Sequence, residues 1–157
     1  MWLADPRAAA IVVNSLLWGA NDRYQLWAWV VMGNHVHLLL TPSVDLSRIT
    51  QGIKGWTAHE INTLHQKRGR IVWQDESYDH WVRDEDELFR ILEYIESNPV
   101  AAGLVSEPKS WPWSSAYWRG RVDWPRGEPL SRSQADSIKR LIKEIEESAW
   151  KDVRPAF

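Results

Sequence analysis

The chain has 157 residues, of which 44% are hydrophobic, so it is long enough for one domain with a substantial core. Its net charge of -2 and pI near 6.2 exclude the strongly basic balance typical of many nucleic-acid-binding domains. The absence of cysteine excludes disulfides, thiolate metal sites and a cysteine nucleophile. Neither a membrane-length apolar run nor a signal-peptide pattern is found, so we expect a cytoplasmic protein without a membrane partner.

A helix followed by a β-hairpin is predicted for the first part of the chain. Asp5 is a good N-cap and Pro6 a good first helical residue, so a helix is expected from there to about residue 18, ended by Gly19. β-Branched and aromatic residues predict strands over residues 24–32 and 35–41. Gly33-Asn34 between them is a tight-turn signal.

A second helix is predicted after the hairpin. Asp45 or Ser47 caps it, and apolar residues at helical spacing continue it to about residue 65. Two extended pieces are expected next, over residues 71–74 and 78–83, and we interpret them as short strands.

A third helix begins at Asp84, a good N-cap that is followed by acidic residues in the first turn. Pro99 is expected to stop this helix after Asn98. The proline- and aromatic-rich stretch over residues 106–130 predicts irregular chain wrapped on the core, and a charged amphipathic helix is expected over residues 131–150.

This order of elements favours an α+β fold of ferredoxin-like type, in which an antiparallel sheet has helices on one face. A complete version of that fold has a strand before the first helix. The chain has almost no sequence there, so we expect the first strand to be missing. Residues 1–125 are expected to form the main domain and residues 126–157 a charged helical tail.

His35 and His37 form the most informative residue pair of the chain. Side chains alternate between the faces of a strand, so both imidazoles project from one face and Val36 from the other. The two lie about 7 Å apart along the strand, close enough to converge on one metal ion. The pair alone leaves open a structural alternative, in which two half-buried histidines are satisfied by hydrogen bonds.

The third helix offers two groups that would complete such a site. Tyr94 and Asn98 are four residues apart and therefore lie one turn apart on the same helical face. An amide oxygen suits Mg²⁺ or Mn²⁺, and a phenol becomes a useful nucleophile against a phosphodiester polarised by a divalent ion. Aromatic residues at helical spacing are also typical of a core, so this pair too has a structural alternative.

The segments around these residues resemble a known family. WAWVVMGNHVHLLL is similar to the WxVMPNHVHLLL signature of the HUH single-tyrosine transposases, specifically the REP-associated tyrosine transposases. SRITQGIKGWTAHEIN is similar to that family's helix with a central lysine followed by a hydroxyl residue. The stretch VWQDESYDHWVRDEDELFRILEYIESNPVAAGLV ends like the family's YIxxNPVxAGLV, and WPWSSAYW is similar to the segment that follows it. The resemblance covers roughly residues 2–120 in unbroken order.

The resemblance implies that residues 1–125 are the catalytic domain of a DNA transposase. It makes His35, His37 and Asn98 the metal ligands, with Mg²⁺ or Mn²⁺ as the cofactor, and Tyr94 the nucleophile. The implied reaction cleaves single-stranded hairpin DNA through a 5′-phosphotyrosine and rejoins it to another 3′-hydroxyl without ATP. Single-stranded or hairpin DNA is the implied partner. A homodimer is a further expectation, because a sheet edge left without its first strand can pair with another chain.

Basic residues outnumber acidic ones between Leu46 and Gln74, which favours contact with phosphates despite the negative net charge. The candidate DNA contacts are Lys54, Lys67, Arg68, Arg70 and, just before the third helix, Arg83. The resemblance selects Lys54 as the best of them, because the family has a lysine there. An ordinary solvated basic face is the alternative. His80, near Arg83, is interpreted as structural.

The chain departs from the family pattern at two places. Gly33 stands where the family has a proline, and glycine serves a turn at least as well. The family's first strand is missing, and its loss could expose a sheet edge. A catalytically inactive remnant that still binds DNA hairpins is therefore the second hypothesis. A hydrolase acting through a metal-bound water is a third, and the lack of an acidic residue beside the histidines to serve as general base counts against it.

Overall fold

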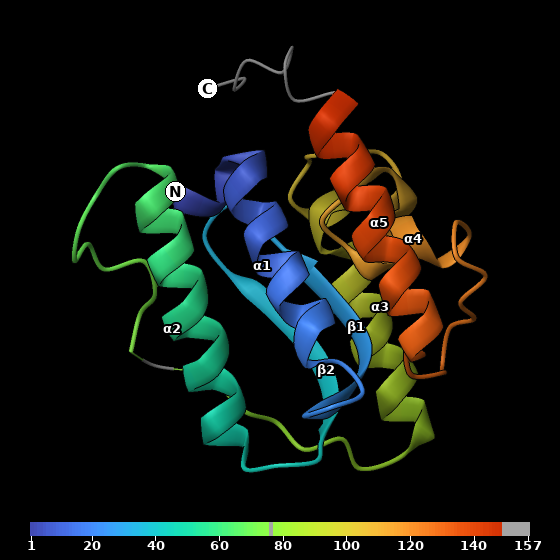
Figure 1. Ribbon diagram of the computed structural model, residues 1–157. Coiled ribbons are helices and arrows are strands. Elements are labelled where there is room, and N and C mark those ends of the chain that lie inside the picture. Colours follow the sequence, from blue (N-terminus) through green and yellow to red (C-terminus); the bar gives the residue numbers. More distant parts are fainter. Residues whose placement is uncertain (76, 149–157) are drawn as a thin grey trace.

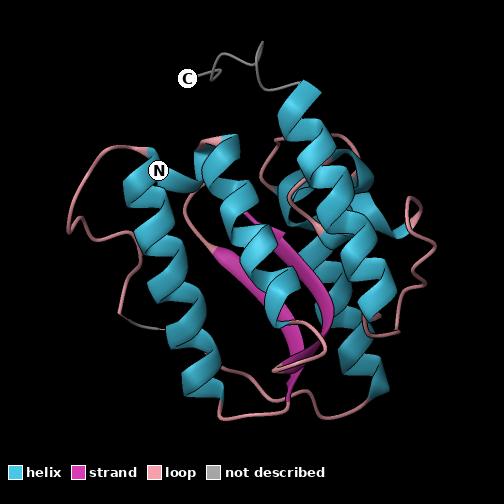
Figure 2. Cartoon of the chain, in the orientation of Figure 1, coloured by secondary structure: helices cyan, strands magenta, loops and turns pink. Residues whose placement is uncertain are grey.

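A two-stranded antiparallel sheet lies at the centre of the molecule with helices around it (Figures 1 and 2). The computed structural model describes residues 1–75 and 77–148. The elements are η1 (Trp2–Ala4), α1 (Pro6–Gly19), β1 (Tyr24–Val31), β2 (Val36–Pro42), α2 (Leu46–Leu64), α3 (Glu85–Ala101), η2 (Pro108–Ser110), α4 (Ser115–Arg119) and α5 (Arg132–Ser148). The predicted α+β class and antiparallel hairpin are confirmed.

Aspartate side chains cap the N-termini of the first three predicted helices. The side chain of Asp5 accepts from the backbone N of Arg7, and that of Asp45 accepts from the backbone N of Ser47, both at 2.9 Å. Asp84 accepts from the N of Glu87 at 2.8 Å. Each carboxylate thus satisfies a backbone donor that the first helical turn leaves unpaired, so these helices begin where the sequence predicts.

The hairpin contains one extra residue. Pairing runs from Tyr24 opposite Pro42 to Val31 opposite Val36, and its register shifts between Leu26 and Ala28. Trp27 is therefore a β-bulge in β1. The bulge lets Trp27 and Ala28 both pack in the cluster beneath α3 although they are neighbours in the chain.

Both faces of the sheet are covered. One face of β1 packs into a cluster with α1, α2 and α5, through Leu26, Trp29 and Val31. The other face packs against Leu92 and Ile95 of α3, through Ala28, Val30 and Met32. Figure 1 shows α1 in front of the strands and α3 behind them. The fold thus differs from the expected single layer of helices, because β1 is apolar on both sides and reads as a strand buried on two faces.

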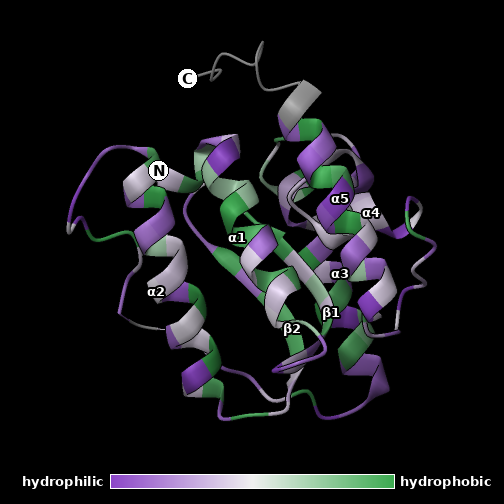
Figure 3. Ribbon diagram, in the orientation of Figure 1, coloured by the Kyte–Doolittle hydropathy of each residue, from purple (hydrophilic) through white to green (hydrophobic). Residues whose placement is uncertain are grey.

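The C-terminal helix α5 packs on the same core as α1. Its residues Ala135, Ile138 and Ile142 are buried in the cluster that contains α1. Figure 3 shows the alternation of hydrophilic and hydrophobic residues along α5 that an amphipathic helix requires. The predicted end of this helix near residue 150, and the rest of the predicted tail, lie outside the described residues.

The outer edge of β1 is closed by irregular chain rather than by a strand. The backbone N of Val31 donates to the carbonyl of Trp113 at 2.8 Å, and Trp111 Nε1 donates to the carbonyl of Val31 at 3.0 Å. Farther along, the N of Leu130 donates to the carbonyl of Leu26 at 2.7 Å. The segment predicted as chain wrapped on the core therefore satisfies this sheet edge, although it also contains the short helix α4.

The short strands predicted over residues 71–74 and 78–83 do not form; this part of the described chain is irregular. Trp73 Nε1 donates to Thr57 Oγ1 at 2.9 Å, so the first piece is fixed along α2 and not beside the sheet. Likewise η1, and not a strand, precedes α1 in the described residues. No helix in the described ranges is long and apolar enough to cross a membrane.

The prediction that Pro99 stops the third helix after Asn98 is wrong, because α3 continues to Ala101. A proline lacks an N–H group and so removes one hydrogen bond to the preceding turn, a small loss this close to a helix end. Pro99 is itself buried. The consequence for the site is that Asn98 lies inside regular helix, where its spacing from Tyr94 is fixed.

Candidate active site

The hairpin turn brings His35 and His37 together at the start of β2. The backbone N of Met32 donates to the carbonyl of His35 at 2.8 Å, and His37 is paired with Val30 in the sheet. The two imidazole rings lie on one face, with centroids 4.8 Å apart and planes at 75°. The alternation of side chains along the strand therefore produces the predicted pair.

Neighbouring groups hold the histidines in forms suited to a metal ion. Nδ1 of His35 lies 2.7 Å from Oδ1 of Asn34. An amide oxygen only accepts, so Nδ1 carries the proton in this contact and Nε2 keeps its lone pair. Burial lowers the pKa of His37, and the nearby His35 lowers this pKa further. The neutral imidazole that results is the form that binds a metal.

Tyr94 meets this pair from α3. Its ring centroid lies 5.5 Å from that of His37, with the planes at 69°. The side chain of Tyr94 is 61% exposed, and its hydroxyl has no hydrogen-bond partner within residues 1–75 and 77–148. A phenol beside two imidazoles and open to solvent is accessible to a substrate.

Asn98 follows Tyr94 by one turn on the same face of α3. Its side chain is partly buried and has no partner in the described part of the chain. Together with His35 and His37 it gives a neutral set of nitrogen and oxygen donors, whose chemistry fits a divalent ion such as Mn²⁺ or Mg²⁺. The described residues contain no group of three His, Cys, Asp or Glu side chains that would form a competing metal centre.

Two of the predicted DNA contacts lie together at the C-terminal end of α2. Lys67 and Arg68 are exposed and line one hollow, and neither side chain has a partner among the described residues. Arg70 is engaged elsewhere. Its guanidinium lies 3.1 Å from the ring centroid of Trp2 and its NH2 group lies 3.1 Å from Nδ1 of His65. The structure therefore leaves Lys67 and Arg68 available for phosphates and uses Arg70 to join the N-terminus to α2.

Of the other two predicted contacts, Lys54 lies on α2 and Arg83 in the irregular chain before α3. Lys54 Nζ donates to the carbonyl of Gln74 at 2.9 Å. Arg83 lies 3.6 Å from the carboxylate of Glu87. His80 Nε2 is 2.7 Å from the same carboxylate, in accordance with its interpretation as structural. The hydrogen bond with His80 and one from the backbone of Arg83 lower the pKa of Glu87.

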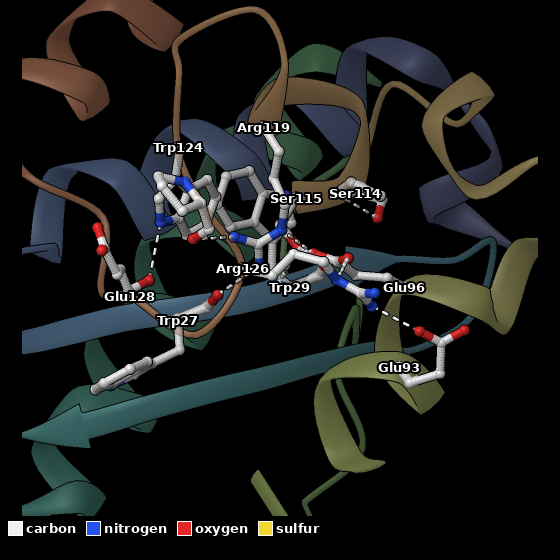
Figure 4. Close-up of polar contacts among 12 residues, drawn as sticks. Trp27, Trp29, Glu93, Glu96, Ser114, Ser115, Arg119, Trp124, Arg126 and Glu128 are labelled. Atoms are coloured by element: carbon white, nitrogen blue, oxygen red, sulfur yellow. Dashed lines mark hydrogen bonds and ion pairs between the residues drawn. The ribbon is translucent and has the colours of Figure 1, made fainter. Parts of the chain in front are cut away.

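Sequence reasoning missed a buried ion pair on the opposite side of α3 (Figure 4). Oε1 of Glu96 accepts from Ser115 Oγ at 2.6 Å and from Arg119 Nε at 2.7 Å. Arg119 also donates to the carbonyl of Trp27, at the bulge of β1, at 2.9 Å. These bonds tie α3 to the sheet.

A signal for this pair was present in the sequence. Leu92, Ile95 and Pro99 mark the buried stripe of α3, and Glu96 falls at the helical spacing that continues the same stripe. Because a buried charge requires a partner, a glutamate in an apolar stripe predicts a buried cation.

Comparisons with known proteins agree on one family. The model of the family described as "Transposase IS200 like" matches residues 16–98, just over half of the chain. A REP-associated tyrosine transposase of Escherichia coli K12 is 27% identical over 124 residues, which cover 70% of this chain and 73% of that protein. A putative REP-associated tyrosine transposase of Haemophilus influenzae is 32% identical over 105 residues, or 60% of each chain.

One solved structure resembles this fold. It is described as a REP-associated tyrosine transposase bound to a REP hairpin. The match has a TM-score of 0.61 and 23% identity, and it covers 73% of this chain and 68% of the other. At this identity the match supports the shared fold.

Proposed function

Because the chain belongs to the family of IS200-like transposases, we propose that it cleaves and rejoins single-stranded DNA at hairpins through a covalent bond to Tyr94. The observation that carries the proposal is the position of the Tyr94 ring, 5.5 Å from His37 and beside the His35–His37 pair. The relatives named as REP-associated tyrosine transposases, one of them bound to a REP hairpin, support hairpin DNA as the substrate.

His35, His37 and Asn98 would hold a divalent ion, Mg²⁺ or Mn²⁺. When bound, such an ion polarises a phosphate oxygen and makes the phosphorus a better target for a nucleophile. Since all three ligands are neutral, they leave the charge of the ion available to the substrate. Asn34 would act behind them by orienting the ring of His35.

The phenol oxygen of Tyr94 is the nucleophile. It forms a bond to phosphorus and gives its proton to solvent, to which the exposed side chain has access. The bond from phosphorus to the 3′ oxygen breaks, and that oxygen takes up a proton to become a 3′-hydroxyl. The phosphate stays on the 5′ end of the downstream fragment, as a 5′-phosphotyrosine. Attack by a second 3′-hydroxyl reverses these steps and joins two strands without ATP.

The basic end of α2 is suited to the DNA backbone. Lys67 and Arg68 are exposed there, and neither is paired with a carboxylate in the described part of the chain. Two such cations neutralise phosphates without reading sequence, which positions a strand rather than selects it. The homodimer and the cytoplasmic location remain predictions, and sedimentation of the purified protein tests the former.

Adduct formation tests the proposal. The protein is incubated with a REP hairpin oligonucleotide carrying single-stranded flanks, with Mn²⁺ or Mg²⁺, and analysed on a denaturing gel. We expect a DNA-linked protein band that Tyr94→Phe abolishes. Tyr78→Phe is the matched control, because Tyr78 is 96% exposed in the loop before α3 and we expect it to retain the adduct.

The position of the label on the DNA tests the chemistry. A 3′-labelled strand should remain on the protein, because the phosphotyrosine is joined to the 5′ end of the downstream fragment, which contains the original 3′ end. Tight hairpin binding without an adduct would contradict the enzyme and favour the alternative, a DNA-binding remnant. Retention of a 5′-labelled strand would contradict the proposed direction of cleavage.

A further inference from the structure

Arg90 continues the row of functional residues on α3. Arg90, Tyr94 and Asn98 are spaced by four residues, so they follow one another along a single helical face. Arg90 lies about 6 Å from Tyr94 along the helix axis, on the N-terminal side. Side chains on a helix lean toward its N-terminus, so the Tyr94 ring extends over the turn that carries Arg90.

Arg90 is exposed and takes part in no ion pair or side-chain hydrogen bond among residues 1–75 and 77–148. Other arginines near α3 are engaged. Arg83 pairs with Glu87, Arg119 with Glu96, and Arg126 with Glu93. A free guanidinium one helical turn from the proposed nucleophile is therefore available to an anion.

Two of the three carboxylates within one helical turn of Arg90 are occupied by other partners. Glu87, three residues before it, accepts from His80 and from the backbone of Arg83. Glu93, three residues after it, accepts from Arg126 and Ser97. The exposed Asp86, four residues before it, makes no ion pair with it in the described chain. Arg90 thus keeps its charge available in spite of acidic neighbours.

The charge distribution along α3 indicates which group Arg90 binds. The first turn carries Glu85, Asp86 and Glu87, which repel an approaching phosphodiester. No lysine or arginine other than Arg90 lies on α3, and Asn98 on the same face is an amide. Arg90 lies between the acidic turn and Tyr94, so it is the charged group of α3 placed to attract the phosphate that Tyr94 attacks.

We propose that Arg90 is a catalytic residue that binds a non-bridging oxygen of the scissile phosphate. The proposal rests on the function proposed for Tyr94. A guanidinium there offers paired N–H donors, holds the phosphorus opposite the phenol oxygen and stabilises the charge that accumulates on the phosphate oxygens during attack. The side chain is long enough for this role, since residues four apart have Cβ atoms only about 5–6 Å apart.

A kinetic test compares Arg90→Gln with Arg140→Gln. Arg140 is a matched control, because it is exposed on α5 and its NH2 group bonds only to Ser137 within the described residues. With saturating REP hairpin oligonucleotide and Mn²⁺, we expect Arg90→Gln to form the adduct about 100-fold more slowly than the unchanged protein. The rate of adduct formation by Arg140→Gln should stay within about twofold of that of the unchanged protein. Arg90→Lys should have an intermediate rate, because lysine keeps the positive charge but lacks the paired N–H donors of a guanidinium.

A binding test asks which phosphate Arg90 contacts. In a Tyr94→Phe background, affinity is measured for the hairpin and for the same hairpin with a neutral methylphosphonate at the linkage that the unchanged protein cuts. Arg90→Gln should weaken binding of the natural DNA about tenfold and of the methylphosphonate DNA less than twofold, since a phosphate contact is worth about this much. Equal losses on both DNAs would overturn the proposal.

The outcomes separate the two proposals. If the unchanged protein forms an adduct and Arg90→Gln forms it equally fast, the role of Arg90 is refuted and that of Tyr94 stands. If the unchanged protein forms no adduct on any hairpin, the function proposed for Tyr94 is refuted, and the role of Arg90 that rests on it is refuted too. Equal melting temperatures of Arg90→Gln and the unchanged protein are expected, because no described contact is lost.

Discussion

Replacing Glu96 by glutamine would leave Arg119 as a buried cation without its counter-charge. The two side chains are only 4% and 9% exposed and their N and O atoms lie 2.7 Å apart. Removal of one partner from a buried ion pair costs about 3–5 kcal/mol. Because the glutamine amide oxygen can still accept from Ser115 or Arg119, we expect the lower end, a loss of about 3 kcal/mol in the free energy of unfolding.

Urea or thermal unfolding followed by tryptophan fluorescence measures this loss, since Trp29 and Trp124 are buried close to the pair. A loss of about 3 kcal/mol corresponds to a decrease of roughly 6–12 °C in Tm for a domain of this size. Glu93→Gln is the matched control on the same helix. Its pair with Arg126 joins side chains that are 61% and 47% exposed, so we expect a loss below about 1 kcal/mol.

A double variant separates the charge from the volume of the pair. Glu96→Gln combined with Arg119→Met removes both charges and should be more stable than Glu96→Gln alone, because no unpaired buried cation remains. Unfolding of Glu96→Gln at the same urea concentration as Glu93→Gln would refute the reasoning that this pair fixes α3 to the sheet.

Three further predictions concern the stability of the scaffold. Burial acts to raise the pKa of Asp5, but hydrogen bonds from Arg7 and His65 lower it on balance, so its carboxylate stabilises the fold fully above the ordinary aspartate pKa and loses this effect as pH falls through the lowered value. Asp5→Asn, which keeps an N-cap, should therefore reduce the stability measured at neutral pH by roughly 1 kcal/mol and make no difference in strong acid. Gly127→Ala should cost about 1–3 kcal/mol in urea unfolding, because φ is +83° and a Cβ would lie 2.7 Å from the ring of Phe89; Gly120→Ala, with open space, should be near neutral. Ser115→Ala should lower the free energy of unfolding by about 1–3 kcal/mol in the same assay, since it removes a hydrogen bond to buried Glu96 and the acceptor of the backbone N–H of Trp29. An unchanged urea midpoint would contradict this.

Local features of the fold could be predicted from the sequence because short-range rules decide them. Aspartate caps fix three helix starts, and Gly33-Asn34 turns the chain between two strands. Alternation along β2 places His35 and His37 on one face, and helical spacing aligns Tyr94 with Asn98. None of these inferences requires knowledge of which elements pack against one another.

The remaining features depend on tertiary contacts that no local pattern contains. Residues 71–74 and 78–83 have strand-like composition, but Trp73 is hydrogen-bonded to α2 and the outer edge of β1 is occupied by residues 111–130. That α3 covers the face opposite α1 follows from the two-sided apolar pattern of β1, which a one-layer interpretation overlooked. Local patterns could not bring Tyr94 to His37, since that contact joins elements far apart in the chain; only the family resemblance placed them in one site.

The two sides of α3 explain how a small sheet can hold a nucleophile in place. Tyr94 and Glu96 are two residues apart, so they point about 200° away from each other around the helix. A roll of α3 that withdrew Tyr94 from His37 would pull Glu96 from Arg119 and Ser115. Since a half-satisfied buried charge is costly, the ion pair resists that roll and fixes the Tyr94 ring against the imidazoles. The same bonds reach the bulge of β1 through Arg119, so the hairpin that carries the histidines and the helix that carries the tyrosine share one anchor.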